Sequence, residues 1–196
     1  MGDPKKQRKK YNPPLHPWQG DRIAEEKVLV DIYGLKNKKE LWKMDAILRK
    51  IKRQTKEFLS KKGMAQTEAE SKLFLEKLAK ACMISPTAKI EDVLDLQLKD
   101  ILERRLQTQM MRKGLAKTAG QARQFIIHGH VLVNGKKMDV PSYLVSKDEE
   151  NKITFAQNSA LIDAEHPARA VKGKEVPSKK EENEDDAEEK SKDGEE

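Results

Sequence analysis

The sequence predicts an α+β protein, with a mostly helical N-terminal region and a small module of two helices and a β-hairpin. Two patterns predict this class. Apolar residues recur every three or four positions over much of residues 21–99, which is the period of an amphipathic helix. Further along, the pair Asn134-Gly135 follows a short alternating segment and favours a tight hairpin, because both residues tolerate positive φ.

We divide the chain into four parts on its composition. Residues 1–20 are a basic arm broken by prolines, and residues 21–99 are a helical domain. Residues 100–156 are the compact module, and residues 157–196 are an extended segment with an acid-rich end. Within residues 175–196, eleven acids stand against four bases, and a segment so poor in apolar residues cannot order itself. We therefore expect a disordered acidic tail.

The first strong helix signal begins at Asn37. This residue has the spacing of an N-cap, with Glu40 at the third helical position. Arg49 and Arg53 lie on a polar face of the same helix, where plain solvation and contact with a polyanion are about equally good explanations. The residues predicted for the buried face are Leu41, Met44, Leu48, Ile51, Thr55 and Phe58.

A second helix is predicted to begin at a capping box formed by Thr67 and Glu70. Ser85-Pro86 is predicted to end it, and residues 90–98 form a short helical link. The apolar face of this helix is predicted to hold Leu75, Leu78 and Cys82.

The compact module is predicted to open with a helix whose capping box is Asp100 and Glu103. Gly114 is predicted to end this helix, because glycine takes the left-handed conformation without steric cost. The apolar stripe of the helix repeats every four positions at Leu102, Leu106 and Met110.

A further helix is predicted from the capping box of Thr118 and Gln121 to Gly129. A short strand then leads into the hairpin turn, and residues 153–155 indicate a small, bent sheet of more than two strands. The buried face of the helix is predicted to hold Ala122, Phe125 and Ile126.

Positive charge is concentrated in the module. Over residues 102–138, eight bases stand against a single acid, Glu103. The whole chain carries +7 and residues 175–196 carry −7, so the remainder carries +14. A compact fold does not need such an imbalance, whereas a surface that binds a polyanion does.

Four short motifs stand in the module: L-E-R-R-L-Q-T (102–108), A-R-Q (122–124), G-H-V-L-V-N-G-K (129–136) and P-S-Y (141–143). Together they resemble the RNA-binding module of the small-subunit ribosomal protein S-four family, which also occurs in some pseudouridine synthases and a tyrosyl-tRNA synthetase. Two N-terminal motifs decide between these families: H-P-W (16–18) and Y-G-L-K-N-K-K-E-L-W (33–42) are similar to the archaeal and eukaryotic branch of the ribosomal family, and within it to its archaeal side. The resemblance covers roughly residues 1–170 and ends before the acidic tail.

This resemblance implies an S-four-type fold and a structural constituent of the cytoplasmic small ribosomal subunit. It implies a primary rRNA-binding protein that nucleates assembly of the 5′ domain and supports translational accuracy beside the path by which messenger RNA enters. Its implied partners are small-subunit rRNA and neighbouring subunit proteins, among them the S-five-type protein. An alternative from a different class is a ribosome-biogenesis or ribosome-rescue factor that carries the same module.

The residues expected to contact RNA are polar or basic. Arginines suit this role as bidentate phosphate forks, lysines act as point charges, and Thr118 offers a hydroxyl at a helix N-terminus. We expect contacts from Arg104, Arg105, Arg112, Lys113, Lys117, Thr118, Gln121, Arg123, Gln124, His128 and Lys136, and from Arg49 and Arg53 in the helical domain.

Other chemistry is less well supported. His128 and His130 flank a glycine, but without a third ligand they do not indicate a metal site. Trp18, Tyr33 and Trp42 suit either base stacking or packing, and packing is the commoner use.

We expect no enzyme activity, cofactor, small-molecule substrate or membrane partner. Phosphate-binding, dinucleotide-binding and nucleophile-elbow motifs are missing, and a pseudouridine synthase would need a further catalytic domain. There is no run of eighteen apolar residues and no apolar leader at the start. The single cysteine, Cys82, excludes an internal disulfide and suggests the reducing cytosol.

Overall fold

The computed structural model describes residues 2, 9–61, 64–163 and 166. The predicted α+β class is confirmed, with a mostly helical N-terminal part and a small antiparallel sheet. The predicted acidic tail lies outside the described residues. In chain order the elements are α1 (Gly20–Ile32), α2 (Lys38–Ser60), α3 (Ala65–Lys80), the 3₁₀ helix η1 (Glu91–Asp95), α4 (Leu98–Glu103), α5 (Leu106–Arg112), α6 (Ala119–Ile127), β1 (Val131–Val133), β2 (Lys136–Lys137), α7 (Lys147–Glu150), β3 (Ile153–Phe155) and the 3₁₀ helix η2 (Ala160–Ile162).

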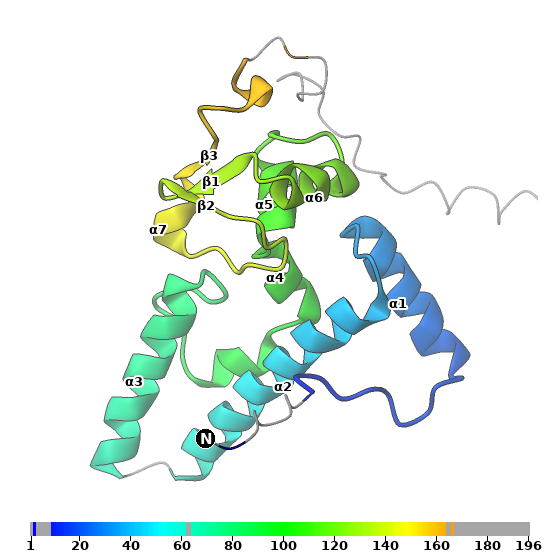
Figure 1. Cartoon of the computed structure of the whole chain (residues 1–196). Helices are drawn as coiled ribbons and strands as arrows, with labels where there is room; N and C mark the ends of the chain where they lie inside the picture. The colour runs from blue at the N-terminus through cyan, green and yellow to red at the C-terminus, as the bar shows by residue number, and fades with distance from the viewer. Residues whose placement is uncertain (1, 3–8, 62–63, 164–165, 167–196) are drawn as a thin grey trace, which may run out of the picture.

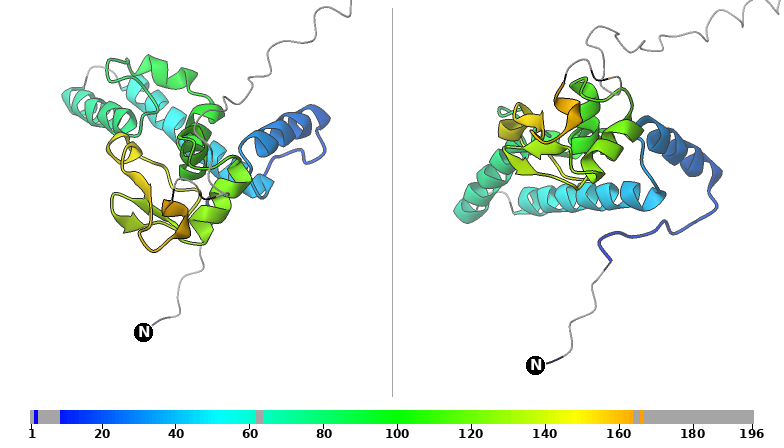
Figure 2. Two further views of the ribbon diagram at one scale, coloured as in Figure 1. Left: turned by 90° about the horizontal axis from the view of Figure 1, so that it is seen from above. Right: turned by 45° about the horizontal axis from the view of Figure 1, so that its top comes forward.

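Helix α2 is the long support of the molecule. Figure 1 shows α1 and α3 on either side of it, and the right panel of Figure 2 shows α2 running beneath the module formed by α5, α6 and the sheet. Among the residues that the structure describes, no helix is long and apolar enough to cross a membrane.

The predicted start and buried face of α2 are confirmed. The Asn37 side chain accepts a hydrogen bond from the Glu40 amide at 3.3 Å, as an N-cap should. Phe58 is half-buried and its ring lies 5.5 Å from that of Phe74 in α3. The predicted positions that are buried are Leu41, Met44, Leu48, Ile51 and Thr55.

The predicted start of α3 is wrong by about one turn. The helix begins at Ala65 with Met64 in the N-cap position, so Thr67 lies inside the helix rather than at its cap. Gln66 donates a hydrogen bond to the Glu70 carboxylate at 3.0 Å, so the Glu70 side chain bonds along the helix surface rather than at a cap. The Thr67 and Glu70 spacing therefore occurs within a helix here, because a four-residue pattern cannot by itself fix a boundary.

The predicted end of α3 is also wrong, because the helix stops at Lys80, before Ser85-Pro86. Cys82 takes a left-handed conformation with φ of 50°, and the Met83 amide donates to the Leu78 carbonyl at 3.1 Å. This is the bond pattern of a Schellman stop. Cys82 therefore belongs to the turn after the helix and not to its apolar face.

The helix predicted from Asp100 is two helices, α4 and α5. Between them Arg105 has an extended conformation and pairs with Leu144 as an isolated β-bridge. The Leu106 amide donates to the Tyr143 carbonyl at 2.8 Å, so a strand-like contact replaces a helical turn. The predicted stripe survives the break, since the residues fully buried are Leu102, Leu106 and Met110.

The predicted cap of α4 is shifted. Asp100 is the third residue of the helix, where its carboxylate accepts a hydrogen bond from the Gln97 amide at 2.7 Å. Asp100 therefore supports a cap at Gln97, one turn earlier than the predicted box with Glu103. Gly114 ends α5 as predicted, with φ of 68° and the Leu115 amide donating to the Met110 carbonyl at 3.0 Å.

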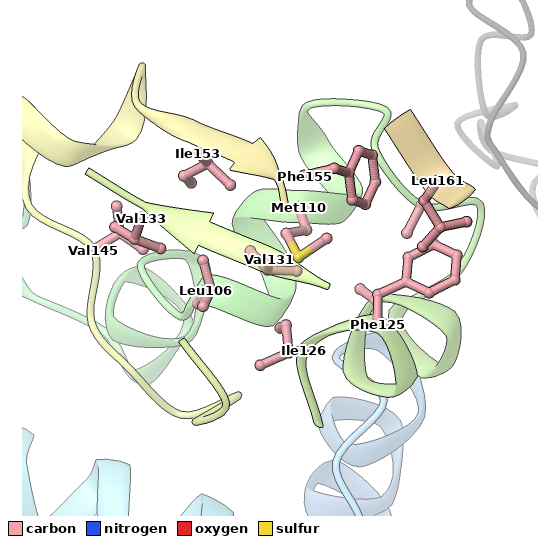
Figure 3. Packing of buried hydrophobic residues seen from close by; sticks show 12 residues of the cluster. Leu106, Met110, Phe125, Ile126, Val131, Val133, Val145, Ile153, Phe155 and Leu161 are labelled. Carbon is pink, nitrogen blue, oxygen red and sulfur yellow. The ribbon is translucent and has the colours of Figure 1, made fainter. Parts of the chain in front are cut away.

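The hairpin and the sheet have the predicted form. Asn134 and Gly135 have φ values of 51° and 76°, as a type I′ turn requires. The antiparallel sheet is three-stranded in the order β2-β1-β3, and Val131 pairs with Phe155. Phe125 of α6 meets Phe155 edge-on at 6.0 Å, and Figure 3 shows the two rings next to Leu161 at one side of the module core.

Two hydrophobic cores lie on either side of the break after α4. Ile101 and Leu102 pack with residues of α2, η1 and the turn at Tyr33. Leu106 and Met110 pack instead with α6 and the sheet. The chain therefore passes from one core to the other within a few residues, and this fixes the position of the module on α2.

Candidate RNA interface

The outer surface of α5, α6 and the hairpin carries most of the residues expected to contact RNA. Their positions follow from the confirmed caps: Gly114 turns the chain after α5, and the Thr118 hydroxyl accepts a hydrogen bond from the Gln121 amide at 3.2 Å. The exposed members of the set are Arg112, Lys117, Thr118, Gln124, His128 and Lys136, and the half-buried members are Lys113, Gln121 and Arg123.

The turn between α5 and α6 places positive charge and a helix N-terminus at the surface. The Gln121 side chain accepts a hydrogen bond from the Lys117 amide at 2.7 Å, so Thr118 and Gln121 together close the start of α6. The positive end of the α6 dipole lies at this exposed start, next to Lys117. Arg112 at the end of α5 is 57% exposed in its side chain, although it also pairs with Glu103 at 2.8 Å. The arrangement can hold phosphate groups.

The hairpin adds a groove of about 620 Å³ between β1, β2 and the segment after β3. His128 and His130 both line this groove. Their rings are nearly parallel, with centroids 6.3 Å apart. His130 Nδ1 lies 2.9 Å from the Ser159 hydroxyl. Within the described part of the chain no three metal-binding side chains come together, so the histidine pair has no third ligand there.

Lys137 and His130 belong to this groove but were not among the expected contacts. Lys137 packs over Gly129 so closely that a Cβ at residue 129 would collide with its side chain. A sequence signal for Lys137 exists, because it stands next to Lys136 after a hairpin turn. No sequence signal places Ser159 beside His130, since the two residues meet only in the folded module.

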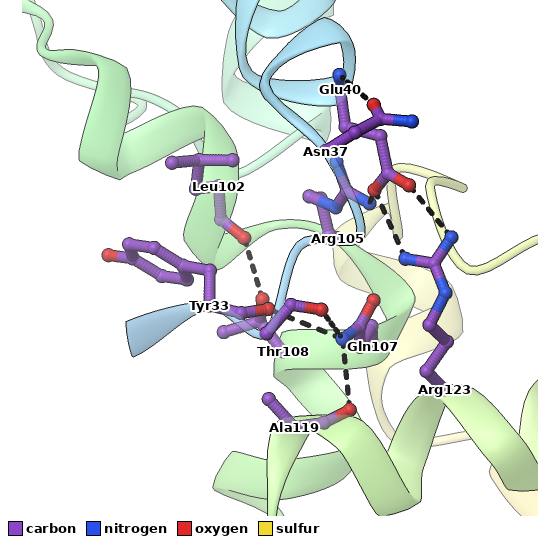
Figure 4. Close-up of polar contacts among 10 residues, drawn as sticks. Tyr33, Asn37, Glu40, Leu102, Arg105, Gln107, Thr108, Ala119 and Arg123 are labelled. Atoms are coloured by element: carbon purple, nitrogen blue, oxygen red, sulfur yellow. Dashed lines mark hydrogen bonds and ion pairs between the residues drawn. The ribbon is translucent and has the colours of Figure 1, made fainter. Parts of the chain in front are cut away.

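Arg105, also expected to contact RNA, is buried with 1% of its side chain exposed. Its guanidinium donates to the Glu40 carboxylate at 2.7 Å, and Arg123 binds the same carboxylate through both oxygens, at 2.7 and 3.2 Å (Figure 4). Burial alone would raise the pKa of Glu40, but the two guanidinium groups outweigh burial and hold that pKa below its ordinary value. Arg105 therefore ties α2 to the module.

Arg104 is likewise used inside the protein. It is only 8% exposed, and it donates to the Val145 carbonyl and to the Glu150 carboxylate, each at 2.9 Å. Lys113 donates to the Glu150 carbonyl. These contacts fix the segment around α7 against α4 and α5, so the RNA contacts proposed below do not include Arg104 or Arg105.

Gln107 joins the turn between α1 and α2 to the module, and no local sequence pattern indicates this role. Its side-chain amide is fully buried and donates to the carbonyls of Tyr33, Gly34 and Ala119, at 3.2, 2.9 and 2.9 Å (Figure 4). We call this contact the seam. It consists of Gly34 and Glu40 on one side and of Arg105, Gln107 and Arg123 on the other.

Arg49 and Arg53 lie elsewhere. Both are exposed on α2 and form pairs one turn apart along the helix, with Asp45 at 2.7 Å and with Glu57 at 3.7 Å. Together with residues of the N-terminal arm they line a separate groove, so the structure does not bring them to the surface formed by α5 and α6.

Comparison with known protein families gives the class of the module. Residues 104–151 match the family model described as the S4 domain, which spans the module from Arg104 to the end of α7. The relatives define the family. The chain is 52% identical over 171 residues to the small ribosomal subunit protein uS4 of Nanoarchaeum equitans, covering 87% of this chain and 95% of that protein. It is 49% identical over 170 residues to the uS4 protein of Methanococcus aeolicus, covering 86% and 96%.

The chain belongs to the uS4 family of small ribosomal subunit proteins. It is therefore a structural, rRNA-binding constituent of the small subunit and not an enzyme, as the sequence predicted. The archaeal side of the predicted resemblance is also confirmed, since both relatives are archaeal proteins.

Proposed function

We propose that the S4-domain surface binds small-subunit rRNA early in assembly and holds the 5′ domain in its folded form. This proposal rests on a difference in burial among the cations of the S4 domain. Arg104 and Arg105 are buried and each pairs with a carboxylate inside the fold, whereas Lys117, just before α6, and Lys136, in the hairpin, are exposed. Cations that point outward from a rigid support suit the convergence of several phosphate backbones.

The same proposal extends to the surroundings on the ribosome. Family membership supports a position beside the path by which messenger RNA enters, next to an S-five-type protein. A protein fixed at that position would support translational accuracy by holding its neighbours in place. The test of this extension is chemical crosslinking of assembled small subunits, in which crosslinks to the S-five-type protein are expected.

The RNA surface is tested with the full chain and in-vitro transcribed small-subunit rRNA. The S4-face variant changes Lys117, Lys136 and Lys137 to Ala. It should bind more weakly, and the slope of log K against log salt should fall by about 3, since each lost phosphate contact removes about 1. The control variant changes three exposed lysines of α3 to Ala: Lys72, Lys77 and Lys80. Equal effects of the two variants would contradict a specific S4-domain surface.

Sedimentation separates a subunit constituent from an assembly factor. A structural protein should sediment with free small subunits and with translating ribosomes. An assembly factor should sediment only with precursor particles. A profile confined to precursors would replace the proposed function with the biogenesis alternative.

A further inference from the structure

A dense run of acids follows the S4 domain near the end of the chain. Residues 181–189 read E-E-N-E-D-D-A-E-E, which is seven acids and no base, and we call them the acidic run. The resemblance to the ribosomal family covers roughly residues 1–170, so rRNA binding by that family does not account for the run. Negative charge is repelled by phosphate and attracted by cations. The counterpart of the acidic run is therefore a basic surface.

The chain leaves the S4 domain beside the groove next to the hairpin. Residues 156–159 form part of the wall of this groove, and the Ser159 hydroxyl lies 2.9 Å from His130 Nδ1. Leu161 of η2 is 6% exposed and packs in the module core beside two phenylalanines (Figure 3). These contacts fix the segment that leads out of the domain, so the acidic run is tethered at the rim of this groove.

Two lysines at this groove have no acidic partner, and we call them the hairpin lysines. Lys137 lines the groove, Lys136 precedes it in β2, and both are exposed. Neither forms an ion pair with a residue that the structure describes, and none of the described residues lining the groove is an aspartate or a glutamate. The exposed Arg49, Arg53 and Arg112 differ, because each pairs with a carboxylate. The hairpin lysines can therefore bind an acidic ligand without first losing a partner.

The length of the tether allows the acidic run to reach these lysines. Residue 181 follows Asp163 by eighteen residues, and a chain covers at most about 3.5 Å per residue, so the run can reach points within about 60 Å of η2. A ligand on a short tether has an effective concentration in the millimolar range, at which even a weak contact is occupied. Because the tether begins at the hairpin groove, this surface is favoured over the basic faces of α2 and α3.

We propose that the acidic run binds the hairpin lysines in the free protein, and that rRNA displaces the run from them. Carboxylates and phosphates both pair with an ammonium group, so the two ligands exclude each other at the same lysine. Exposed ion pairs contribute little free energy, so the contact is weak and reversible. The proposal rests on the proposed function in that the hairpin lysines belong to the S4-domain surface that would contact RNA.

Such a contact matters most for RNA that binds weakly. A competitor on the lysines lowers the apparent affinity of every RNA that needs them by the same factor, since only the open fraction of the protein can bind. An RNA held by few contacts is then released, whereas small-subunit rRNA, which would contact further parts of the protein, stays bound. The acidic run would thus protect the free protein from unproductive RNA.

The first test is carbodiimide crosslinking of the full chain without RNA, which joins a carboxylate to a lysine amine where the two are paired. Crosslinks from the acidic run to Lys136 or Lys137 are expected at low salt. They should vanish at about 1 M salt, where charges are screened beyond about 3 Å. A mixture of isotope-labelled and unlabelled protein identifies crosslinks between copies. Crosslinks only between copies, crosslinks only to lysines of α2 and α3, or none at all would each overturn the proposal.

The second test measures competition with RNA. The run-neutral variant changes all seven acids of residues 181–189 to Gln or Asn and keeps the length of the chain. Its affinity for a short oligo(U) should rise at least about threefold at low salt, because the lysines are no longer occupied. In the S4-face variant, which lacks the hairpin lysines and Lys117, the same change should have almost no effect. An equal rise in both backgrounds would show a general effect of net charge and contradict the contact.

A matched control holds the change in net charge constant. One variant removes three acids from the acidic run, through Glu184→Gln, Asp185→Asn and Asp186→Asn. The other removes three exposed acids from α1, through Asp21→Asn, Glu25→Gln and Asp31→Asn. The first variant should bind oligo(U) more tightly than the parent protein, and the second should stay close to the parent. Equal gains in the two variants would mean that the position of the acids is irrelevant, and the contact would be wrong.

The two proposals fail in distinguishable ways, because crosslinking needs no RNA. If the S4-face variant keeps full affinity for small-subunit rRNA but the crosslinks to the hairpin lysines form, the proposed RNA surface is wrong and the acidic contact stands. If the S4-face variant loses rRNA binding and no such crosslinks form, the acidic contact is wrong and the proposed RNA surface stands.

Discussion

Arginines stand in two contrasting environments in this protein, the seam and the outer face of α2. At the seam, Arg105 is 1% exposed and shares the Glu40 carboxylate with Arg123. On the outer face, Arg49 and Arg53 are mostly exposed, and each pairs with an acid of its own helix. The first pair of arginines joins elements far apart in the sequence, whereas the ion pairs of the second pair, among the residues that the structure describes, stay within α2.

This difference shows that a count of arginines does not locate an RNA surface. A buried guanidinium must keep its carboxylate, because an unpaired charge in the interior is costly. An exposed one can exchange its carboxylate for a phosphate. The seam arginines therefore serve the fold, and we propose that the exposed cations contact RNA.

The largest expected effect comes from removing one seam charge. Arg105→Met should lower the free energy of unfolding by about 3–5 kcal/mol, because Glu40 loses a buried partner. Arg49→Met should change it by no more than about 0.5 kcal/mol, since its pair is exposed. Urea unfolding of both variants measures the contrast. Similar losses would remove the distinction between the two environments.

Glycine substitution tests the closeness of the seam. Gly34 has φ of 57°, and a Cβ there would lie 2.7 Å from the Ala119 Cβ. Gly34→Ala should lower the free energy of unfolding through two costs, about 1–2 kcal/mol of backbone strain and about 1–3 kcal/mol of overpacking. Gly135 has φ of 76° but open space around it, so Gly135→Ala should show the strain alone.

Thermal unfolding measures the stability lost in Gly34→Ala and in Gly135→Ala. Gly120→Ala is the control, because Gly120 lies in α6 without positive φ and without near neighbours. It should be neutral or stabilising, since alanine favours a helix. If Gly34→Ala costs no more than Gly135→Ala, the seam is less tightly packed than the structure indicates.

Acidification should reduce the contribution of the seam to the stability of the fold. The pKa of Glu40 lies below its ordinary value of 4.5 in the folded protein, where burial is outweighed by the two guanidinium groups. Its contribution to stability is therefore present above pH 4.5 and is lost as the pH falls through the lowered pKa. Glu40→Gln should be less stable at neutral pH and should lose less stability on acidification. Parallel pH profiles of the two proteins would contradict this role.

The smallest effect is a shifted titration at the edge of the seam. Burial and the hydrogen bond to Glu103 raise the pKa of Tyr33 to about 12. Its raised pKa contributes stability below the ordinary value of 10.0, and this is lost as the pH rises toward 12. Tyrosinate absorbance should show a late step that Tyr33→Phe removes and Glu103→Gln moves to lower pH. A late step that survives in Tyr33→Phe would assign it to another tyrosine.

Local patterns in the sequence determined much of this protein. The cap at Asn37, the stop at Gly114 and the Asn134-Gly135 turn are contacts within a few residues, so their geometry depends on those residues alone. The buried positions of α2 and the stripe at Leu102, Leu106 and Met110 followed from periodicity, because burial acts on one face of a helix.

Only the tertiary structure decided how the cations are used. Arg105 and Arg112 look alike in the sequence, yet one is bound to Glu40, 65 residues away, and the other remains on the surface. The break after α4 arises from pairing with Leu144, which no local pattern encodes. Long-range partners set burial, and burial sets whether a guanidinium completes the fold or stays open to RNA.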